Sequence, residues 1–488
     1  MASSEIRQAR VKKLGLLRKA GELAYPASSK RTHEVQELLK GFSALVKLGK
    51  EVTAVGRIRS VREHGGSTFF HIEDGTGKMQ AYLKKDRVGE KAYQFFLDVF
   101  DIGDFVQVRG VLFSTKKGEK TIEARSVKML AKSLLPLPEK WHGLKDEEER
   151  YRKRYLDLIF NKEVKEKFEK RTLALKSIRE FLDKKGFLEV ETPVLQNIYG
   201  GADAKPFRTH LNAFNLDMYL RISLELPLKR LIVGGFEKVY EMGRVFRNEG
   251  VDRQHNPDFT ILEFYWAYAD YKDMMKFTEE LISFVVQKVT GKKEIEYEGR
   301  KINFKTPWPR VEYAELFRKY LKLDIESLNR DALVKEAKKL GIDIAKSFNK
   351  SRVADALYKK AIRPKLWEPQ FILHHPAEMF PLAKTRADDS SKAESFQLLV
   401  GGGWELVKAY SEQNDPMVQK KAFEEQESLF KKGLEDAQRM DTDFIEALEY
   451  GMPPAAGFGM GVDRLVALLT DSHSLREVIL FPTMKPKN

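Results

Sequence analysis

The chain of 488 residues contains no cysteine. Disulfides, thiolate metal sites and cysteine nucleophiles are therefore excluded, and the composition suits a reducing compartment. No run of eighteen or more apolar residues occurs, so no membrane-spanning helix is expected. The N-terminal stretch MASSEIRQARVKK lacks the apolar core of a secretory signal. We therefore expect a cytoplasmic protein with no membrane partner.

Several nucleotide-binding and catalytic signatures are also missing. No Gly-Lys-Ser/Thr follows a glycine-rich loop, so a P-loop is not expected. The glycines of GFGMG at 457–461 do not have the spacing of a dinucleotide-binding loop. Neither HExxH nor a nucleophile elbow occurs. Phosphate handling must therefore depend on arginines and on metal held by carboxylates.

What the chain does have is positive charge. Lys and Arg number 86 against 72 Asp and Glu, which gives a formal net charge of +14. Basic surface attracts polyanions at long range, so a nucleic-acid partner is favoured. A hydrophobic content of 42% is typical of a folded protein, and 488 residues predict two or more domains.

The first part of the chain predicts a small barrel. Residues 1–50 form a basic helical extension, with an amphipathic helix at 4–25 that docks on the protein or contacts RNA. Five short strands within 51–135, with a helical insert at 89–99, predict an OB-type β-barrel. Residues 136–150 are punctuated by proline and then strongly charged, which predicts a linker.

The predicted barrel carries aromatic rings among cations. Phe69 and Phe70 accompany Arg57, Arg59 and Arg62, and single-stranded nucleic acid is bound by stacking on rings within a positive surface. Alternation along a strand sends one of the two rings into the core and the other outward. The sequence therefore favours a nucleic-acid-binding barrel over a purely structural one.

Residues 151–488 mix helices and strands without regular alternation. Long helices are predicted at 163–185 and 272–290, and a Lys-rich, mostly helical insertion spans 329–367. Such irregular order favours an antiparallel sheet over a doubly wound one. The predicted fold class is α+β: a five-stranded OB-type barrel followed by an antiparallel-sheet domain with flanking helices.

The most informative stretch is RVFRNEGVDRQHNPDFTILEFY at 244–265. It predicts a strand, a polar loop and a second strand, with Arg247 continuing the alternation of the first strand. Alternation places four side chains of the second strand on one face: Phe259, Ile261, Glu263 and Tyr265. A guanidinium, a ring and an acid beside a tyrosine suit a phosphate, a base and a cationic small molecule. The alternative is an ordinary hairpin with a solvated polar tip.

Three further charged residues suit phosphate or cation binding. Arg464 is predicted in the first turn of a helix at 462–470, where the helix dipole favours an anion. Glu405 and Glu412 are spaced for a strand and its following turn, and such carboxylates hold Mg²⁺ or pair with a cation. Each of them taken singly is more often a solvated surface residue.

Together these segments resemble the class II lysyl-tRNA synthetases over almost the whole chain. FLDKKGFLEVETPVL is similar to motif 1, a dimer-interface helix and strand, and FRNEG with HNPDFTILEFY is similar to motif 2. GFGMGVDRL running into LREVILFP is similar to motif 3, and GRIRSVREHGG with FHIEDGTGKMQAY is similar to the anticodon-binding barrel. The resemblance implies ATP-dependent attachment of L-lysine to tRNA(Lys) through lysyl-adenylate, by a homodimer.

The resemblance also implies roles for individual residues. The expected ATP-binding residues are Arg247, Glu249, His255, Asn256, Phe259, Glu405 and Arg464, of which Arg247, Glu405 and Arg464 are catalytic. The expected lysine-binding residues are Gly200, Glu225, Glu263, Tyr265, Lys408 and Glu412. In the barrel, Phe69 is expected to stack on an anticodon base while Arg57, Gln80 and Glu119 read base edges. Mg²⁺ is the expected cofactor, with Glu405, Glu412 and Gln397 as its ligands.

Two alternatives remain open. Glu225, Glu263 and Glu412 agree with a buried ammonium, which needs carboxylates to offset its desolvation. An aspartyl or asparaginyl enzyme would need cations there, so these acids disfavour it. Three positions depart from the family pattern: Gln254 replaces a frequent arginine, Gln397 a metal-binding glutamate and Lys408 an asparagine. They motivate the second alternative, a non-catalytic RNA-binding paralogue.

Overall fold

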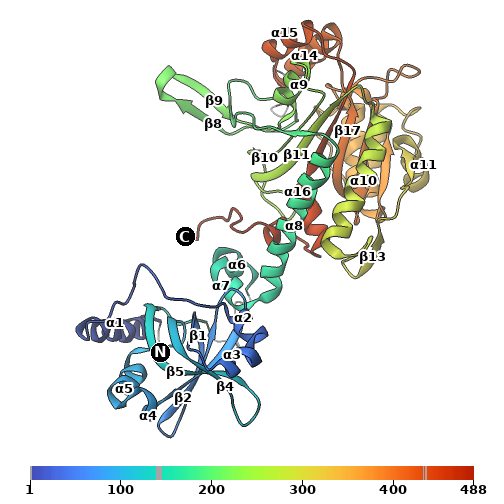
Figure 1. Cartoon of the computed structure of the whole chain (residues 1–488). Helices are drawn as coiled ribbons and strands as arrows, with labels where there is room; N and C mark the ends of the chain where they lie inside the picture. The colour runs from blue at the N-terminus through green and yellow to red at the C-terminus, as the bar shows by residue number, and fades with distance from the viewer. Residues whose placement is uncertain (1–2, 139–145, 432, 435–436, 488) are drawn as a thin grey trace. The chain divides into compact units, whose positions relative to one another are not determined.

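The computed structural model describes residues 3–138, 146–431, 433–434 and 437–487. The chain divides into two compact units, Met1–Lys145 and Asp146–Asn488, which Figure 1 draws along the chain from blue to red. Within the described ranges, no helix is both long enough and apolar enough to cross a membrane.

The first unit contains the predicted barrel, which is closed in the strand order β1-β2-β3-β5-β4. Its strands are β1 (Val52–His64), β2 (Ser67–Glu73), β3 (Lys78–Lys84), β4 (Phe105–Ser114) and β5 (Lys120–Ala131). Helices α4 (Lys85–Val88) and α5 (Glu90–Val99) fill the connection between β3 and β4, as the predicted helical insert requires. Phe70 and Ile72 point into the barrel and are buried, because alternate residues of a strand share a face.

Three helices precede the barrel and belong to the same unit. They are α1 (Ser3–Lys19), α2 (Val35–Lys40) and α3 (Phe42–Leu48). Leu14 and Leu17 of α1 join the core of the barrel, and Arg10 donates hydrogen bonds to the carbonyl oxygens of Ser133 at 3.1 Å and Leu135 at 3.0 Å. The helix therefore docks on the barrel, and it ends at Lys19 and not at residue 25.

The predicted linker at 136–150 falls partly on residues 139–145, which lie outside the described residues. After them the charged segment is helical. Asp146 caps α6 (Glu147–Arg152) by accepting hydrogen bonds from the backbone N–H groups of Glu148 and Glu149. The second unit thus begins inside the segment that the sequence assigned to a linker.

The second unit is built on an eight-stranded sheet in the order β14-β15-β16-β17-β18-β11-β10-β6. The strands are β14 (Arg310–Glu312), β15 (Gln370–Leu373), β16 (Ser395–Val400), β17 (Trp404–Ser411), β18 (Ala455–Gly461), β11 (Asp258–Ala267), β10 (Lys238–Phe246) and β6 (Leu188–Glu189). The six inner strands pair antiparallel, which confirms the predicted α+β class, whereas the edge strands β14 and β6 pair in parallel. Segment FLEVETPVL supplies β6 and the start of β7 (Leu195–Gln196), not one continuous strand.

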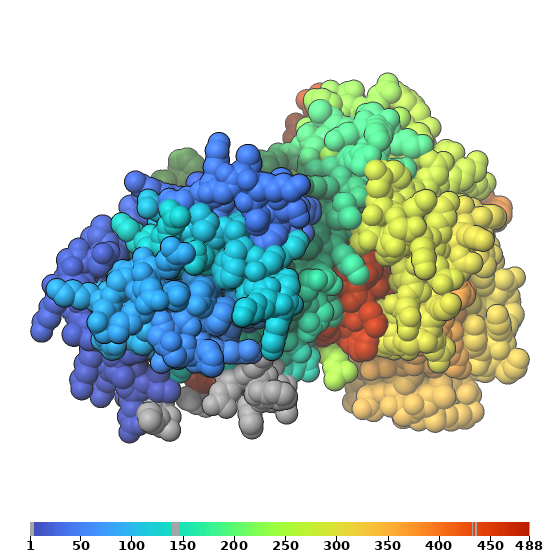
Figure 2. Space-filling model, turned by 60° about the horizontal axis from the view of Figure 1, so that its bottom comes forward, coloured from blue at the N-terminus to red at the C-terminus, as the bar shows by residue number. Residues whose placement is uncertain are grey.

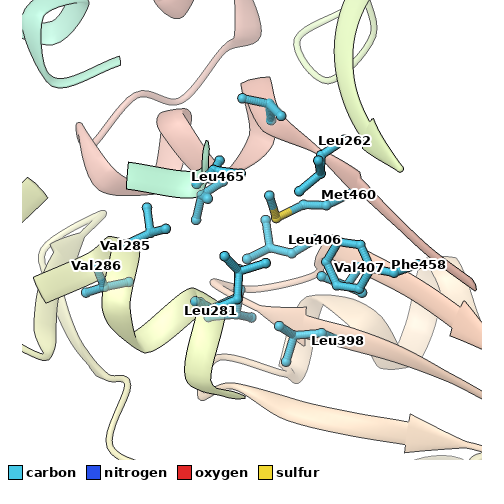
Figure 3. Close-up of a cluster of buried hydrophobic side chains, with 14 of the residues drawn as sticks. Leu262, Leu281, Val285, Val286, Leu398, Leu406, Val407, Phe458, Met460 and Leu465 are labelled. Carbon is cyan, nitrogen blue, oxygen red and sulfur yellow. The ribbon is translucent and has the colours of Figure 1, made fainter. Parts of the chain in front are cut away.

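Helices α8 (Lys162–Lys184), α10 (Tyr271–Thr290) and α16 (Val462–Leu469) cover one face of this sheet. Figure 3 shows Leu262 and Met460 of the sheet meeting Leu281 of α10 and Leu465 of α16. In Figure 2 the C-terminal part of this unit (red) reaches the surface between α8 (green) and the segment of α10 (yellow). The apolar core therefore lies on this side of the sheet.

The opposite face is only partly covered. Helices α9 (Glu225–Val233), α14 (Pro416–Lys431) and α15 (Thr442–Glu449) pack on its end with a smaller core. Alternation along β18 sends Phe458 and Met460 into the main core, so the glycines between them face the other way. The polar side chains of the neighbouring strands project from this second face.

The predicted insertion at 329–367 is largely helical. It contains α12 (Arg330–Lys339) and α13 (Lys350–Leu357), followed by the single turns η2 (Tyr358–Ile362) and η3 (Arg363–Lys365). Leu333, Val353 and Leu357 form a separate small core with Phe317 of α11 (Tyr313–Leu321).

Candidate active site

A cavity of about 470 Å³ opens on the partly covered face of the large sheet. That volume suits a small molecule or nucleotide. The predicted site residues that line it are Glu225, Arg247, Glu249, His255, Asn256, Phe259, Glu263, Tyr265, Gln397, Glu405, Lys408 and Arg464. Gly200 does not line it; a Cβ at Gly200 would lie 2.7 Å from Leu226, and the cavity wall begins at Gly201.

Strand pairing aligns polar residues in a row across the sheet. Glu263 of β11 pairs with Gly459 of β18, Gly459 with Lys408 of β17, and Lys408 with Gln397 of β16. Directly paired residues share a face, and neighbouring strands lie about 4.8 Å apart. The backbones of Glu263 and Lys408 are therefore roughly 10 Å apart, with only a glycine between them.

Position 457, two residues before Gly459 on the same strand, requires glycine because two side chains approach it closely. It pairs with Tyr265 on one side and with Tyr410 on the other. A Cβ at Gly457 would lie 1.9 Å from Glu412 Oε1 and 2.6 Å from Tyr265 Cε1. At Gly459, on the same face, the nearest atom would be the Lys408 carbonyl oxygen at 3.8 Å. Motif GFGMG thus makes room for an acid and a tyrosine.

One end of the cavity is acidic. Glu263 is buried, and its Oε1 accepts hydrogen bonds from Ser223 Oγ at 2.9 Å and the Leu224 N–H at 3.2 Å. Burial and the nearby Glu225 raise the pKa of Glu263 to about 7. The Tyr410 hydroxyl donates to Glu225 at 2.8 Å. A cation entering this end would meet two buried carboxylates.

Lys229 lies behind the acidic end and was not among the predicted residues. Its Nζ is 2.6 Å from Glu225 Oε1 and also pairs with Glu412, and all three side chains are buried. Glu412 does not line the cavity, because its carboxylate faces Lys229. The expected contact of Glu412 with the lysine substrate stays a prediction. The i,i+4 spacing of Glu225 and Lys229 on a helix was the available signal.

The other end of the cavity is basic. The Arg247 guanidinium carbon lies 5.1 Å from the centre of the Phe259 ring. Arg464, in the first turn of α16 as predicted, donates from Nη1 to the Glu405 carbonyl oxygen at 3.0 Å. The Glu405 carboxylate is 3.3 Å from Arg363 Nη1. Arg464 is therefore half-buried and held against β17, not an exposed side chain.

The loop between β10 and β11 departs from the expected alternation. Strand β10 ends at Phe246, so Arg247 and Glu249 belong to the loop. His255 is exposed, with Nδ1 2.9 Å from the Asp252 carboxylate. Asn256 is buried: it donates to the Asp258 carbonyl oxygen at 2.6 Å and accepts from the Thr483 N–H at 3.4 Å. Both ends of the Asn256 amide hold the loop, although it borders the cavity.

The helical insertion contributes part of the cavity wall, which the sequence did not reveal. Asn349 and Arg352 lie at the start of α13, Asp355 lies further along it, and Lys359 lies in the following turn. Lys359 pairs with Asp355 at 2.7 Å. The Lys-rich segment is therefore more than a solvated surface.

The predicted magnesium ligands do not form a metal site. Gln397 Oε1 already accepts a hydrogen bond from the Tyr358 hydroxyl at 3.2 Å. Glu412 lies just after the end of β17, seven positions beyond Glu405, and is paired with Lys229. In the part of the chain that the structure describes, no three His, Cys, Asp or Glu residues are placed to hold a metal. The set Glu405, Glu412 and Gln397 therefore does not fit a protein-held Mg²⁺.

The barrel carries a separate aromatic surface. Phe69 is half-exposed while Phe70 is buried, as alternation predicts. The Phe69 ring centre is 4.5 Å from that of Tyr82, which lies 5.9 Å from that of Phe113. Tyr82 of β3 and Phe113 of β4 were not predicted, because the order of the strands around the barrel could not be derived from the sequence alone.

The three predicted base-reading residues are bonded within the barrel. Gln80 is buried and donates to Thr121 Oγ1 at 2.9 Å. Glu119 lies 3.1 Å from His71 Nε2. Arg57 donates to the Gly103 carbonyl oxygen at 3.0 Å, and its guanidinium lies 4.2 Å from the Phe105 ring centre.

Comparison with known proteins agrees with both units. Residues 146–485 match the family described as tRNA synthetases class II (D, K and N), and residues 52–130 match the OB-fold nucleic acid binding domain. The chain is 49% identical over 487 residues to a lysine–tRNA ligase of Thermoanaerobacter sp. (strain X514), covering 99% of this chain and 97% of that protein. It is 48% identical to a lysine–tRNA ligase of Carboxydothermus hydrogenoformans, with 99% of both chains covered. It is 46% identical to one of Fervidobacterium nodosum, over 99% of this chain and 94% of that one.

These matches run over almost the full length and include every segment that builds the cavity. The chain therefore belongs to the lysine–tRNA ligase family of class II tRNA synthetases.

Proposed function

We propose that the protein attaches L-lysine to tRNA(Lys) in an ATP-dependent reaction that passes through lysyl-adenylate and releases AMP and pyrophosphate. The observation that supports this most strongly is the polarity of one cavity. Its acidic end holds Glu225 and Glu263, and its basic end holds Arg247 and Arg464 beside the Phe259 ring. A lysine ammonium suits the first end, and the phosphates and base of ATP suit the second.

The chemistry needs no covalent enzyme intermediate. A carboxylate oxygen of lysine attacks the α-phosphorus of ATP, and the bond to pyrophosphate breaks. The terminal ribose hydroxyl of tRNA then attacks the lysyl carbonyl, and AMP leaves. Arg247, at the basic end, would stabilise charge on the α-phosphate, and Arg464 would bind the outer phosphates. Magnesium bound to ATP would neutralise part of the phosphate charge.

We assign the specificity for lysine to Glu263. It is the acid of the sheet row that faces the cavity, and Tyr265 lies beside it with its hydroxyl 3.5 Å from Oε2. Glu225 shares its carboxylate with Tyr410 and Lys229, so it would contact the substrate amino group with the remaining lone pairs. Lys229 lies behind this end of the cavity, where it pairs with Glu225 and Glu412.

The aromatic surface of the barrel is proposed to bind the anticodon. Phe69, Tyr82 and Phe113 form a continuous run of rings on its face. Bases stack on such rings, and each stacked base contributes about 1–3 kcal/mol. Arg57, Gln80 and Glu119 would read base edges only after exchanging their present hydrogen bonds.

A homodimer is proposed from exposed apolar side chains in and around motif 1. These residues are between 39% and 77% exposed: Leu173, Leu188, Val194, Leu195, Ile198, Phe214 and Leu216. Strands β8 (Arg208–Leu211) and β9 (Leu216–Leu220) extend from the body of the unit, as Figure 1 shows. Sedimentation analysis tests this: Phe214→Asp should yield monomers, whereas Tyr450→Asp, at an equally exposed position elsewhere, should not.

Amino-acid-dependent exchange of pyrophosphate into ATP tests the activity. We expect exchange with lysine and none with aspartate or asparagine, because the end that binds the side chain is acidic. Exchange with aspartate alone would establish the other branch of the class, and RNA binding without exchange for any amino acid would establish a non-catalytic paralogue.

A further inference from the structure

At the basic end of the cavity the Glu405 carboxylate lies among several cations. Burial alone would raise the pKa of Glu405, but Arg363, Arg464, Lys408 and Lys359 together hold it below its ordinary value. Arg363 is in direct contact with the carboxylate at 3.3 Å. The charge near Glu405 is therefore positive.

Lys408 is the cation of this group that faces the cavity from the sheet. It stands in the row between Gly459 and Gln397, and its Nζ lies 4.0 Å from the centre of the Phe380 ring. Among residues 3–138, 146–431, 433–434 and 437–487, no carboxylate forms an ion pair with Lys408. Its ammonium is thus available to an anion that enters the cavity.

The side chain opposite Lys408 cannot compensate this charge. Gln397 is neutral, and its Oε1 is engaged by the Tyr358 hydroxyl. Mg²⁺ binds through hard, preferably anionic oxygen ligands. A divalent cation held between Glu405 and Gln397 would have one carboxylate from this pair and would be repelled by Arg363 and Lys408.

We propose that the Lys408 ammonium binds the triphosphate of ATP directly and takes the place of a protein-held divalent cation, so that the enzyme requires only the Mg²⁺ that accompanies ATP. This inference rests on the proposed function, since it assigns a ligand to the same cavity. The resemblance placed Lys408 among the lysine-binding residues, so the two assignments predict different kinetic effects. A phosphate contact raises the KM for ATP when removed, and a carboxylate contact raises the KM for lysine.

The first experiment measures metal binding without catalysis. Mn²⁺ is titrated into the full-length, nucleotide-free protein and followed by electron paramagnetic resonance. We expect no tight Mn²⁺ site in the natural chain. The double variant Gln397→Glu/Lys408→Asn should bind Mn²⁺ at least about tenfold more tightly, which corresponds to about 1.4 kcal/mol. A tight site in the natural chain that is lost in Glu405→Gln would overturn the proposal.

The second experiment varies free Mg²⁺ in the lysine-dependent exchange assay. Exchange should reach its plateau when total Mg²⁺ equals the sum of ATP and pyrophosphate, which both bind it, and Lys408→Asn should raise the KM for ATP about tenfold, the effect of losing one charge-assisted contact. Lys360→Asn, an exposed lysine beside Lys359 that does not line the cavity, should change neither quantity. A several-fold rise with Mg²⁺ beyond equivalence, or a Lys408→Asn effect confined to the KM for lysine, would contradict the proposal. If no exchange occurs at any Mg²⁺ concentration, the proposed function fails, and the Mn²⁺ titration still decides the metal question.

Discussion

The acidic end of the cavity predicts that lysine binding depends on pH through Glu263. This carboxyl is buried, and its pKa is raised to about 7 by burial and by Glu225. The Ser223 hydroxyl, the Leu224 N–H and Arg247 oppose that rise without cancelling it. The lysine ammonium should bind the ionised form, so binding releases a proton wherever the free carboxyl is protonated.

The size of the effect follows from that pKa. Glu263 is about one-tenth ionised at pH 6 and about nine-tenths ionised at pH 8, so the Kd for lysine should be about tenfold higher at pH 6 than at pH 8. Ionisation of Glu263 at higher pH strengthens lysine binding but lowers the stability of the fold. Because the folded pKa lies above the ordinary value of 4.5, the unfolded chain loses this proton first, and the fold loses stability as the pH rises between the two values. At about 1.4 kcal/mol per pH unit the cost is about 3 kcal/mol, which a bound ammonium would partly offset.

Isothermal titration calorimetry with lysine from pH 6 to pH 8 measures both quantities, and buffers of different ionisation enthalpy report the released proton. Lysine keeps its side-chain charge throughout this range, so the protein supplies the change. Glu263→Gln should weaken binding and abolish the pH dependence, while its thermal transition should vary less with pH. Equal Kd values at pH 6 and pH 8 in the natural chain would refute the reasoning.

Three further predictions concern single side chains. Gly457→Ala should weaken lysine binding and lower stability by roughly 2 kcal/mol, because the added methyl group would overlap Glu412 and Tyr265. Gly459→Ala, where the nearest atom would be 3.8 Å away, should be tolerated. Calorimetry with lysine and thermal melting of both variants check this, and equal behaviour of the two would count against the close approach at Gly457. Arg464→Ala should abolish lysine-dependent exchange with the fold retained by circular dichroism, because among the described residues its side chain donates a single hydrogen bond, to the Glu405 carbonyl oxygen; exchange near the natural rate would remove Arg464 from the site. Phe69→Ala should weaken tRNA binding about tenfold or more and spare exchange, and a parallel loss of both would contradict a separate anticodon surface.

Much of the site was predictable because alternation along a strand is a local property. Alternation along the strand places Phe259, Glu263 and Tyr265 on one face, and in the structure all three line the cavity. Motif order gave the family and hence Arg247 and Arg464. The cavity confirms that these residues lie together, while their roles toward ATP and lysine stay predictions.

Two expectations differ from the structure, for different reasons. Arg247 was expected to continue the alternation of the first strand, but β10 ends at Phe246, where its pairing with β11 stops. Gly200 was chosen by motif position, yet it packs on Leu226 and its neighbour Gly201 faces the cavity.

The sequence by itself determined the two units, the α+β class and the face on which each strand residue lies, because these depend on composition and on short-range periodicity. Tertiary structure decided which charges meet. Glu225 and Tyr410 are 185 positions apart, and Glu405 and Arg363 are 42 apart, so only the pairing of strands and the packing of helices brings them into contact. The same packing assigned Glu412 to Lys229 and brought the insertion to the cavity wall. The strength of an ion pair depends on distance and burial, and sequence spacing specifies neither for residues on different elements.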